Sequence, residues 1–544
     1  MRTSTAATAA HQGEEGDSFL QAARYIAGVV SDGTVPSREA LEKLKKRAAK
    51  LYSLDRYVPN SAIISVLPPG SKEAFGRMLQ VHPRRSASGI IVVTAFSAPF
   101  SCPHGTCVFC PGGPRAGTPQ SYLTGSPGMK SAIVAGFDPY LQVRKSLAKY
   151  EANGHETDKV ETIIEGGTFI ALPLDYQKGF VKGVYDGLNG QASPTLGEAQ
   201  ARNESARSRC VGLTLESKPD WCRPKDIDLM LDFGITRLEI GVQSLHDSTL
   251  SRSNRGHTVA DTVEAFRVAR DAGLKVTAHM MPGLPGATIE EDLEDLKVLF
   301  ASENFRPDMM KLYPTLVVPG TALHRQFESG LYHPYNLETV VELLSDMKRF
   351  IPKWHRIMRI QREIPAGEIS GGVRNGNLRQ LVLTRAEEKG WGCNCIRCRE
   401  VALSEPSAME LGDSLEYREE RYSASGGLEV FSSFEYARSG RIAGFLRLRV
   451  PSPKAHRPEM KPEGTATVVR ELRVYGRQVE VGGRRDDAWQ HKGLGGALLE
   501  KAERLSKEEF DAGRVLVTSA VGTRGYYRRH GYERMGPYVA KALK

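Results

Sequence analysis

The sequence predicts an α/β protein with a partial (βα)6 barrel, a smaller α+β domain after it and a helical extension before it. The 544 residues exceed what one hydrophobic core ordinarily organises, so two or more domains are expected. From residue 89 onward, short apolar runs alternate with longer amphipathic segments, which is the pattern of βαβ units and a parallel sheet. From residue 413 the pattern changes to alternating strands around one glycine-rich helix start.

The N-terminal region divides into two predicted segments. Residues 1–18 have no apolar signal core and are expected to form a disordered tail, whereas residues 19–88 contain two amphipathic stretches and are expected to be helical. The sequences "EKLKKRAAKLY" (42–52) and "HPRRS" (82–86) make this extension basic. The net charge of +10 favours a polyanionic partner, while a solvated helix face is the alternative for the first of these sequences. No run of about 18 apolar residues occurs, so we expect no membrane span and a cytoplasmic location.

Residues 89–350 are predicted to form the barrel. Its six expected strands lie at 89–97, 159–169, 210–221, 236–244, 274–286 and 307–316. In barrels of this kind the chemistry takes place at the C-terminal ends of the strands. Glycines and polar residues occupy these ends here, namely Gly166, Gly167, Glu216, Gln243 and His279. We therefore expect these five residues to line the site.

Three cysteines follow the first expected strand in "SCPHGTCVFCPGG" (101–113). Their spacing is C-x4-C-x2-C, formed by Cys102, Cys107 and Cys110. Tight thiol clusters in a cytoplasmic chain predict a metal site and not a disulfide framework. A zinc site would need a fourth ligand, for which His104 is the local candidate. Three thiolates on a four-iron cluster would instead leave one iron open to bind a substrate or cofactor.

A second thiol group lies in residues 351–412, which are predicted to link the barrel to the last domain. Its members are Cys393, Cys395 and Cys398. We expect a structural zinc site with an unassigned fourth ligand, for which His355 and Cys222 qualify by residue type; free surface cysteines are the alternative. The arginine-rich segments 357–365 and 371–385 are expected either to line a path for a polyanion or to form a salt-bridged surface.

Residues 413–544 contain a glycine-rich helix start in "QHKGLGGALLEKAE". The relevant residues are Gln490, Gly493, Leu494, Gly495 and Gly496. Glycines let the backbone approach a pyrophosphate, and a helix N-terminus offers unpaired N–H groups to it. The alternative is a glycine-rich helix start without a ligand.

The cysteine loop after the first strand and the Gly166-Gly167 turn after the second resemble the radical S-adenosylmethionine (SAM) superfamily. The resemblance implies a [4Fe–4S] cluster on the three cysteines of 102–110, with SAM bound at the open iron. It further implies that Gly166 and Gly167 contact the methionine part of SAM. We also expect Glu216 and Gln243 to belong to the cofactor site.

The last domain resembles the GNAT acyltransferases, which bind acetyl-CoA. The resemblance implies that the strand containing Glu471, Leu472, Arg473 and Val474 contacts the pantetheine and acetyl end. It implies a tyrosine near the thioester sulfur, for which Tyr527 is favoured over its neighbour Tyr526. It also implies that Lys159 contacts acetyl-CoA from the barrel side; an exposed lysine at a strand end is the alternative.

The two domains together, with "CPGGP", "EGGTFIALP", "NRGHTV", "KLYPTLV" and "VGTRGYYRRHGY", resemble the family of the catalytic third subunit of Elongator over residues 20–544. The first cysteine gap is shorter than in the eukaryotic subunit, which indicates a stand-alone microbial form. The resemblance implies that a 5′-deoxyadenosyl radical abstracts hydrogen from the acetyl-CoA methyl group. The carbon radical would then add to C5 of uridine 34, and thioester hydrolysis would give 5-carboxymethyluridine.

The implied partners are tRNA, bound at its anticodon stem-loop, and an electron donor. A polyanionic substrate agrees with the basic charge. Two alternatives remain: a protein lysine acetyltransferase whose iron–sulfur domain is only structural, and a module that carries tRNA without catalysis. A structural cluster needs neither an open iron nor a glycine turn for SAM, and intact cysteines disfavour a non-catalytic module.

Overall fold

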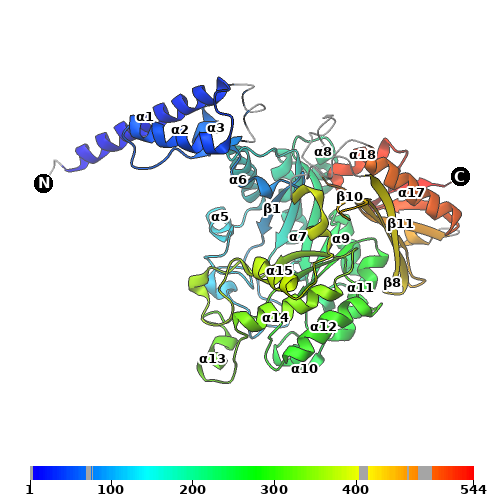
Figure 1. Cartoon of the computed structure of the whole chain (residues 1–544). Helices are drawn as coiled ribbons and strands as arrows, with labels where there is room; N and C mark the ends of the chain where they lie inside the picture. Colours follow the sequence, from blue (N-terminus) through cyan, green and yellow to red (C-terminus); the bar gives the residue numbers. More distant parts are fainter. Residues whose placement is uncertain are drawn as a thin grey trace.

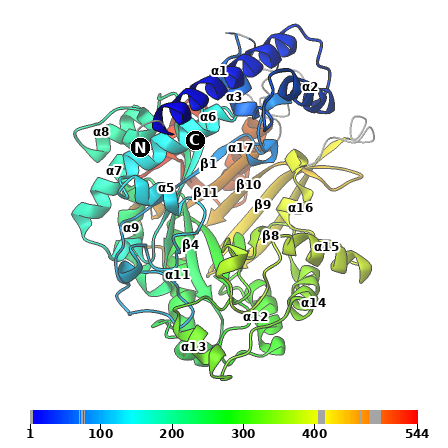
Figure 2. The ribbon, with the colours of Figure 1, turned by 90° about the vertical axis from the view of Figure 1, so that its left-hand side faces the viewer.

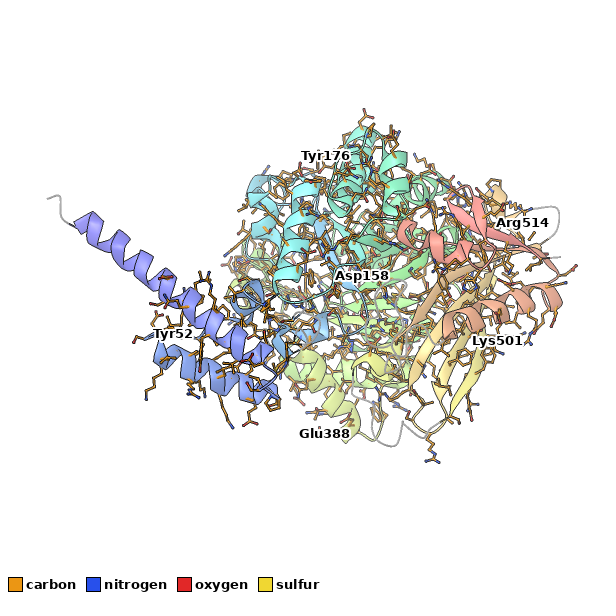
Figure 3. All side chains as sticks on the ribbon, turned by 90° about the horizontal axis from the view of Figure 1, so that it is seen from above. Tyr52, Asp158, Tyr176, Glu388, Lys501 and Arg514 are labelled. Carbon is orange, nitrogen blue, oxygen red and sulfur yellow. The ribbon has the colours of Figure 1, made fainter. Side chains whose placement is uncertain are left out.

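The computed structural model describes residues 4–68, 71, 75, 78–403, 414–461, 465–475 and 493–543. The chain forms three parts, with the termini at opposite ends of the molecule (Figure 1). Seen from above, the N-terminal helices that carry Tyr52 and the C-terminal domain that carries Lys501 lie on opposite sides of the barrel (Figure 3). Within the described residues, no helix is both long enough and apolar enough to cross a bilayer.

The central part is a seven-stranded, entirely parallel sheet in the order β1-β2-β3-β4-β5-β6-β7. Its strands are β1 (Ile91–Phe96), β2 (Lys159–Glu165), β3 (Arg209–Ser217), β4 (Arg237–Gln243), β5 (Lys275–Met280), β6 (Met309–Leu312) and β7 (Arg356–Ile360). The main connecting helices lie outside the curved sheet (Figure 2). They are α6 (Pro139–Ala152), α7 (Leu174–Asn189), α8 (Leu196–Asn203), α9 (Pro224–Asp232), α11 (Val259–Asp271), α12 (Ile289–Ala301), α14 (Leu337–Met347) and α15 (Leu378–Glu388). Shorter helices lie in the loops: α5 (Met129–Val134), α10 (Asp247–Arg252), α13 (Ala322–Glu328) and α16 (Ile396–Arg399).

The prediction of a parallel barrel sheet is confirmed, but the strand count and the end of the barrel need correction. The seventh strand, β7, lies inside the predicted linker 351–412 and inside the arginine-rich segment 357–365. Its sequence, RIMRI, has arginine at its first and fourth positions, so it lacks the continuous apolar run typical of a buried parallel strand. Arg356 is nevertheless buried because it forms an ion pair with Glu400.

The N-terminal part packs three helices around a core of its own: α1 (Ser4–Ser31), α2 (Arg38–Leu51) and α3 (Asn60–Ser65). This part contacts the barrel through α3 and α6. The structure differs from the predicted disordered tail, since α1 begins at Ser4. The alanines of "STAATAA" have high helix propensity, which explains why the helix extends into this segment.

The C-terminal part is a second seven-stranded sheet in the order β13-β14-β12-β11-β10-β9-β8. Its strands are β8 (Leu415–Ala424), β9 (Gly427–Tyr436), β10 (Ile442–Val450), β11 (Thr465–Val474), β12 (Ala512–Val517), β13 (Glu533–Met535) and β14 (Tyr538–Ala542). The helices are α17 (Leu494–Glu508) and α18 (Arg524–Arg528). Strands β11 and β12 pair in parallel, and α17 lies between them in the chain, so the glycine-rich segment opens a crossover helix.

The C-terminal domain joins the barrel through a seam of buried ion pairs. Asp308, directly before β6, accepts two hydrogen bonds from Arg470 of β11, at 2.7 and 2.6 Å. Asp271 at the end of α11 pairs with Arg449 of β10 at 2.6 Å. Glu429 of β9 bonds to both Arg449 and Arg470, at 2.8 and 2.7 Å. These five charged side chains, which we call the seam, fix how the two sheets sit against each other.

Candidate functional site

A cavity of ≈ 420 Å³ opens at the C-terminal edge of the barrel sheet. Its walls include Glu216 and Gln243, as predicted, together with His279. The same cavity extends past the cysteine loop to Val81, His82, Arg85, Lys149 and Tyr150, at the junction with the N-terminal helices. Three of the five predicted strand-end residues thus line one hollow, which we call the upper cavity, whereas Gly166 and Gly167 are not among its walls.

The cysteine loop is held tightly against the turn after β2. Gly167 has φ +59°, and a Cβ there would lie 3.2 Å from the Cys102 sulfur. Gly166 has φ +142°, and a Cβ there would lie only 2.0 Å from Ser97 Oγ. Both positions therefore require glycine on steric and conformational grounds. In this structure the two glycines leave room for the cysteine loop, including the Cys102 thiol, to lie against the end of β2.

The thiol geometry favours a polynuclear cluster over a single zinc ion. Thiolates on one zinc lie within about 4 Å of one another because each is about 2.3 Å from the ion. Among the described residues, Cys393, Cys395 and Cys398 form a group of ligand atoms within 4.8 Å, but Cys102, Cys107 and Cys110 form no such group. Wider spacing suits thiolates that bind different irons of one cluster.

His104 lies beside the cysteines, with Nε2 3.2 Å from the Cys107 sulfur. Burial, together with the charges of Lys218 and Arg255, lowers the pKa of His104 to about 4, so its ring is neutral. Its contact is a hydrogen bond to a thiol of the triplet. The three cysteines therefore fit the residues expected to hold a [4Fe–4S] cluster.

Carboxylates at the sheet edge differ in protonation. Burial and then the nearby Glu216 raise the pKa of Glu165 to about 8, so Glu165 carries a proton at neutral pH. Glu216 accepts a hydrogen bond from Tyr122 at 3.0 Å. Glu239 accepts one from His279 at 2.9 Å if the tautomer places the proton on Nε2, and forms an ion pair with Lys311. Glu216, Glu239 and His279 lie close enough to bind a metal ion, but the ammonium of Lys311 already pairs with both carboxylates.

A second, smaller cavity of ≈ 90 Å³ lies where β11 meets the opposite edge of the barrel sheet. Its walls bring together Glu471, Leu472, Arg473 and Tyr527, four of the residues predicted to bind acetyl-CoA. The barrel contributes Glu161, Gly212, Thr236, Arg237 and Lys275. Burial lowers the pKa of Lys275, despite the opposing charges of Glu471 and Glu161. We call this hollow the lower cavity.

Charged side chains link the two cavities through the barrel interior. Arg473 lies 3.4 Å from Glu161, which pairs with Arg237. Arg237 lies 3.5 Å from Glu239, which continues to Lys311. In order from the lower to the upper cavity, this axial ladder comprises Arg473, Glu161, Arg237, Glu239, Lys311 and Glu216. Apolar layers, the usual filling of a barrel, are thus replaced by ion pairs along this line.

The remaining predicted acyl-site residues lie around the start of α17. Gly493 is the N-cap, with φ +83°, and Leu494, Gly495 and Gly496 form the first turn. A Cβ on Gly495 would lie 2.7 Å from the Tyr526 hydroxyl and 3.7 Å from Val474. The two tyrosines therefore divide, with Tyr526 at the helix start and Tyr527 in the lower cavity.

Among the described residues, several predicted ones do not line either cavity, including Gly166, Gly167, Val474 and Lys159. Gln490 lies outside the described residues. Lys159 begins β2, two residues before Glu161, and is not among the residues that line the lower cavity. Burial lowers the pKa of Lys159.

The second thiol group is compact and stands next to a buried lysine. Lys348 is fully buried, and its Nζ lies 3.6 Å from the Cys393 sulfur. Neither predicted fourth ligand joins the group: His355 bonds through Nδ1 to the Pro307 carbonyl, and Cys222 bonds to the Lys218 carbonyl. Residue type alone suggested these two; His355 keeps a buried Nε2 with no hydrogen-bond partner among the described residues and interacts electrostatically with Cys395, so its role as the fourth ligand stays a prediction.

Sequence reasoning missed several site residues, chiefly Tyr122, Arg255 and Lys311, whereas Arg359 and Arg362 belong to the segment 357–365, for which a polyanion path was one of the two expectations. Arg255 donates to the Cys107 sulfur, and Arg359 and Arg362 line the upper cavity. Arg255 belongs to "NRGHTV" and Lys311 to "KLYPTLV", two motifs that were visible but carried no assigned chemistry. Tyr122 had no signal because its role depends on a contact with Glu216, 94 residues away.

Comparison with known proteins identifies the family. Residues 99–299 match the Radical SAM superfamily, residues 307–388 the Radical_SAM C-terminal domain and residues 19–87 the ELP3 N-terminal domain. A tRNA uridine(34) acetyltransferase of Methanocaldococcus infernus is 41% identical over 94% of this chain and 97% of its own. Elongator complex protein 3 of Homo sapiens is 41% identical over 93% of each chain.

A solved structure agrees with these relationships. The archaeal Methanocaldococcus infernus Elp3 with an N-terminal deletion has a TM-score of 0.73 and 41% identity, covering 84% of this chain and all of its own. Archaeal and human relatives are equally similar in sequence, so the stand-alone microbial form stays a prediction. The chain belongs to the Elongator complex protein 3 family, within the radical SAM superfamily.

Proposed function

We propose that the protein modifies uridine 34 of tRNA to 5-carboxymethyluridine, using SAM and acetyl-CoA. One observation carries the proposal: a single cavity joins the residues beside the three cysteines to the basic junction with the N-terminal helices. Arg85, Lys149, Arg359 and Arg362 line this cavity and suit the phosphates of an RNA strand. The helix α2 of the N-terminal part carries further exposed cations, Lys43, Lys46, Arg47 and Lys50. The names of two archaeal relatives, tRNA uridine(34) acetyltransferase, agree with such a substrate.

The upper cavity provides the groups that the radical half-reaction needs. A [4Fe–4S] cluster held by Cys102, Cys107 and Cys110 supplies, when bound, the electron that cleaves SAM to methionine and a 5′-deoxyadenosyl radical. Gly166 and Gly167 leave the backbone free to meet the methionine part, and Glu216 and Gln243 can orient the nucleoside. The protonated Glu165 can donate a hydrogen bond there, which an ionised carboxylate cannot.

The C-terminal domain is proposed to be a GNAT-type acetyl-CoA site. The start of α17 offers N–H groups and three glycines for a pyrophosphate, and β11 leads from there to the lower cavity. Glu471, Leu472 and Arg473 would contact the pantetheine and acetyl end, with Tyr527 near the thioester. The axial ladder lies between the two cavities, and the radical is proposed to form at the upper one. The proposed reaction therefore requires the acetyl group to leave the lower cavity and reach the upper cavity.

The test is an anaerobic reaction of reconstituted protein with tRNA, SAM, dithionite and acetyl-CoA. Mass spectrometry of the digested tRNA should detect 5-carboxymethyluridine, and should detect none in a matched tRNA with cytidine at position 34. Each of SAM, reductant and acetyl-CoA should be required. Acetylated lysine peptides without any modified tRNA would instead support the acetyltransferase alternative.

The second cysteine group is proposed to bind one structural zinc ion. The compact thiols support this, and the Lys348 ammonium offsets part of their negative charge. Cys395→Ser should remove about one equivalent of zinc, measured by elemental analysis, because each thiolate is needed for a stable site. The iron content should stay at the wild-type level, since the other triplet is untouched. Unchanged zinc in this variant would reject the site.

A further inference from the structure

A loop after α10 is hydrogen-bonded to the cysteine loop. The backbone N–H of Val108 donates to the Ser253 carbonyl at 3.1 Å, and Asn254 Nδ2 donates to the Thr106 carbonyl at 2.8 Å. Between these contacts Arg255 points inward. Its Nη1 donates to the Cys107 sulfur at 3.3 Å and its Nη2 to the Gly241 carbonyl at 2.7 Å.

The guanidinium of Arg255 packs closely against the backbone of Gly241. A Cβ on Gly241 would lie 2.9 Å from Arg255 Nη2, so a larger residue would displace the guanidinium. Arg255 is only 7% exposed and Cys107 only 5%. The contact is therefore shielded from solvent, and charge interactions are stronger in the protein interior than in water.

Arg255 lacks the usual counter-charge. In the part of the chain that the structure describes, its guanidinium forms no ion pair with an aspartate or glutamate. The neighbouring Lys218 is already paired with Asp220 at 3.0 Å and donates to the Arg255 carbonyl at 2.7 Å. A buried guanidinium without a carboxylate is costly. The anion that can compensate it is the Cys107 thiolate and the group that this thiolate binds.

We propose that Arg255 is a positioning residue that acts through Cys107 to raise the reduction potential of the cluster. This inference rests on the proposed function, because it requires a four-iron cluster on the three cysteines. A one-electron reduction adds negative charge to the cluster, and a fixed positive charge with an N–H···S bond stabilises the reduced form more than the oxidised form. Arg255 thereby makes the electron easier to deliver.

The experiment measures the midpoint potential of the reconstituted cluster, without SAM, by anaerobic potentiometry with electron paramagnetic resonance. Arg255→Met should shift the ratio of reduced to oxidised cluster at least tenfold toward oxidised, which is about 59 mV to more negative potential for one electron. Arg255→Lys keeps a charge and should shift less. Arg252→Met is the matched control, because it removes an exposed arginine from the same segment and should leave the potential unchanged.

Other outcomes separate the possible failures. Equal potentials in wild type and Arg255→Met, with equal iron content, would overturn the inference alone. A weaker affinity for SAM without a change in potential would also overturn it and assign Arg255 to SAM binding. If Arg255→Met does not retain iron, Arg255→Gln takes its place, and the same fall in potential is expected. A wild-type protein without any four-iron signal would overturn the proposed function itself.

Discussion

Replacing Cys110 by alanine should abolish SAM cleavage while leaving acetyl-CoA binding intact. Cys110 is buried and its sulfur lies 3.1 Å from Ser121 Oγ, so no exposed thiol can substitute for it. Two thiolates cannot hold the cluster that three are expected to hold. The residues proposed to bind the acetyl end of acetyl-CoA line the lower cavity, at the other end of the barrel strands from this loop. We expect the release of 5′-deoxyadenosine to fall below detection.

The measurement combines chromatography of 5′-deoxyadenosine with calorimetric titration of acetyl-CoA. Cys210→Ala is the matched control, because Cys210 is also a buried cysteine in the barrel but lies at the start of β3, far from the cysteine loop in the sheet. The control should keep its iron and its SAM cleavage. Continued cleavage by Cys110→Ala would remove that cysteine from the proposed cluster.

Asp308→Ala should produce the largest loss of stability among single changes at the seam. Removing this carboxylate leaves Arg470 buried opposite an apolar side chain, with Glu429 as its remaining anionic partner. Breaking a buried ion pair from one side typically costs about 3–5 kcal/mol. A fall in the urea midpoint, followed by circular dichroism, should report this cost. Glu338→Ala removes an exposed partner of Arg385 and should change stability by less than about 1 kcal/mol.

The same carboxylate predicts how stability depends on pH. Burial alone would raise the pKa of Asp308, but the Arg470 guanidinium, followed by Arg447 and Arg270, holds it well below its ordinary value. The folded state therefore binds this proton less readily than the unfolded state, whose aspartates have a pKa near 3.9. The stabilisation is complete above about pH 4 and is lost progressively as the pH falls below that value. Acid unfolding of Asp308→Ala should lack this component; an identical acid transition in wild type and variant would contradict it.

The sequence was sufficient for the features that depend on local pattern. The cysteine spacing, the Gly166-Gly167 turn and the alternation of strands and helices each occupy a short segment, so the barrel and the cysteine loop could be located. The strand β7 was missed because its arginines resemble a surface, and the burial of Arg356 depends on an ion pair with Glu400, 44 residues along the chain. Arg255 and Tyr122 act through residues far along the chain, and no local pattern encodes such contacts.

The seam has a consequence for the order in which the chain is made. During synthesis the barrel leaves the ribosome before β9, β10 and β11 have been made. At that stage Asp271 and Asp308 do not yet have Arg449 and Arg470 as ion-pair partners. This face carries the two carboxylates beside apolar side chains that later join the core shared with the C-terminal sheet. When the C-terminal sheet forms, its arginines can pair with these carboxylates. A strand docked in the wrong place would bring charges of the same sign together, which is unfavourable. The polar seam thus gives the C-terminal domain, the last part of the chain to be made, a charge-matched surface on which to dock.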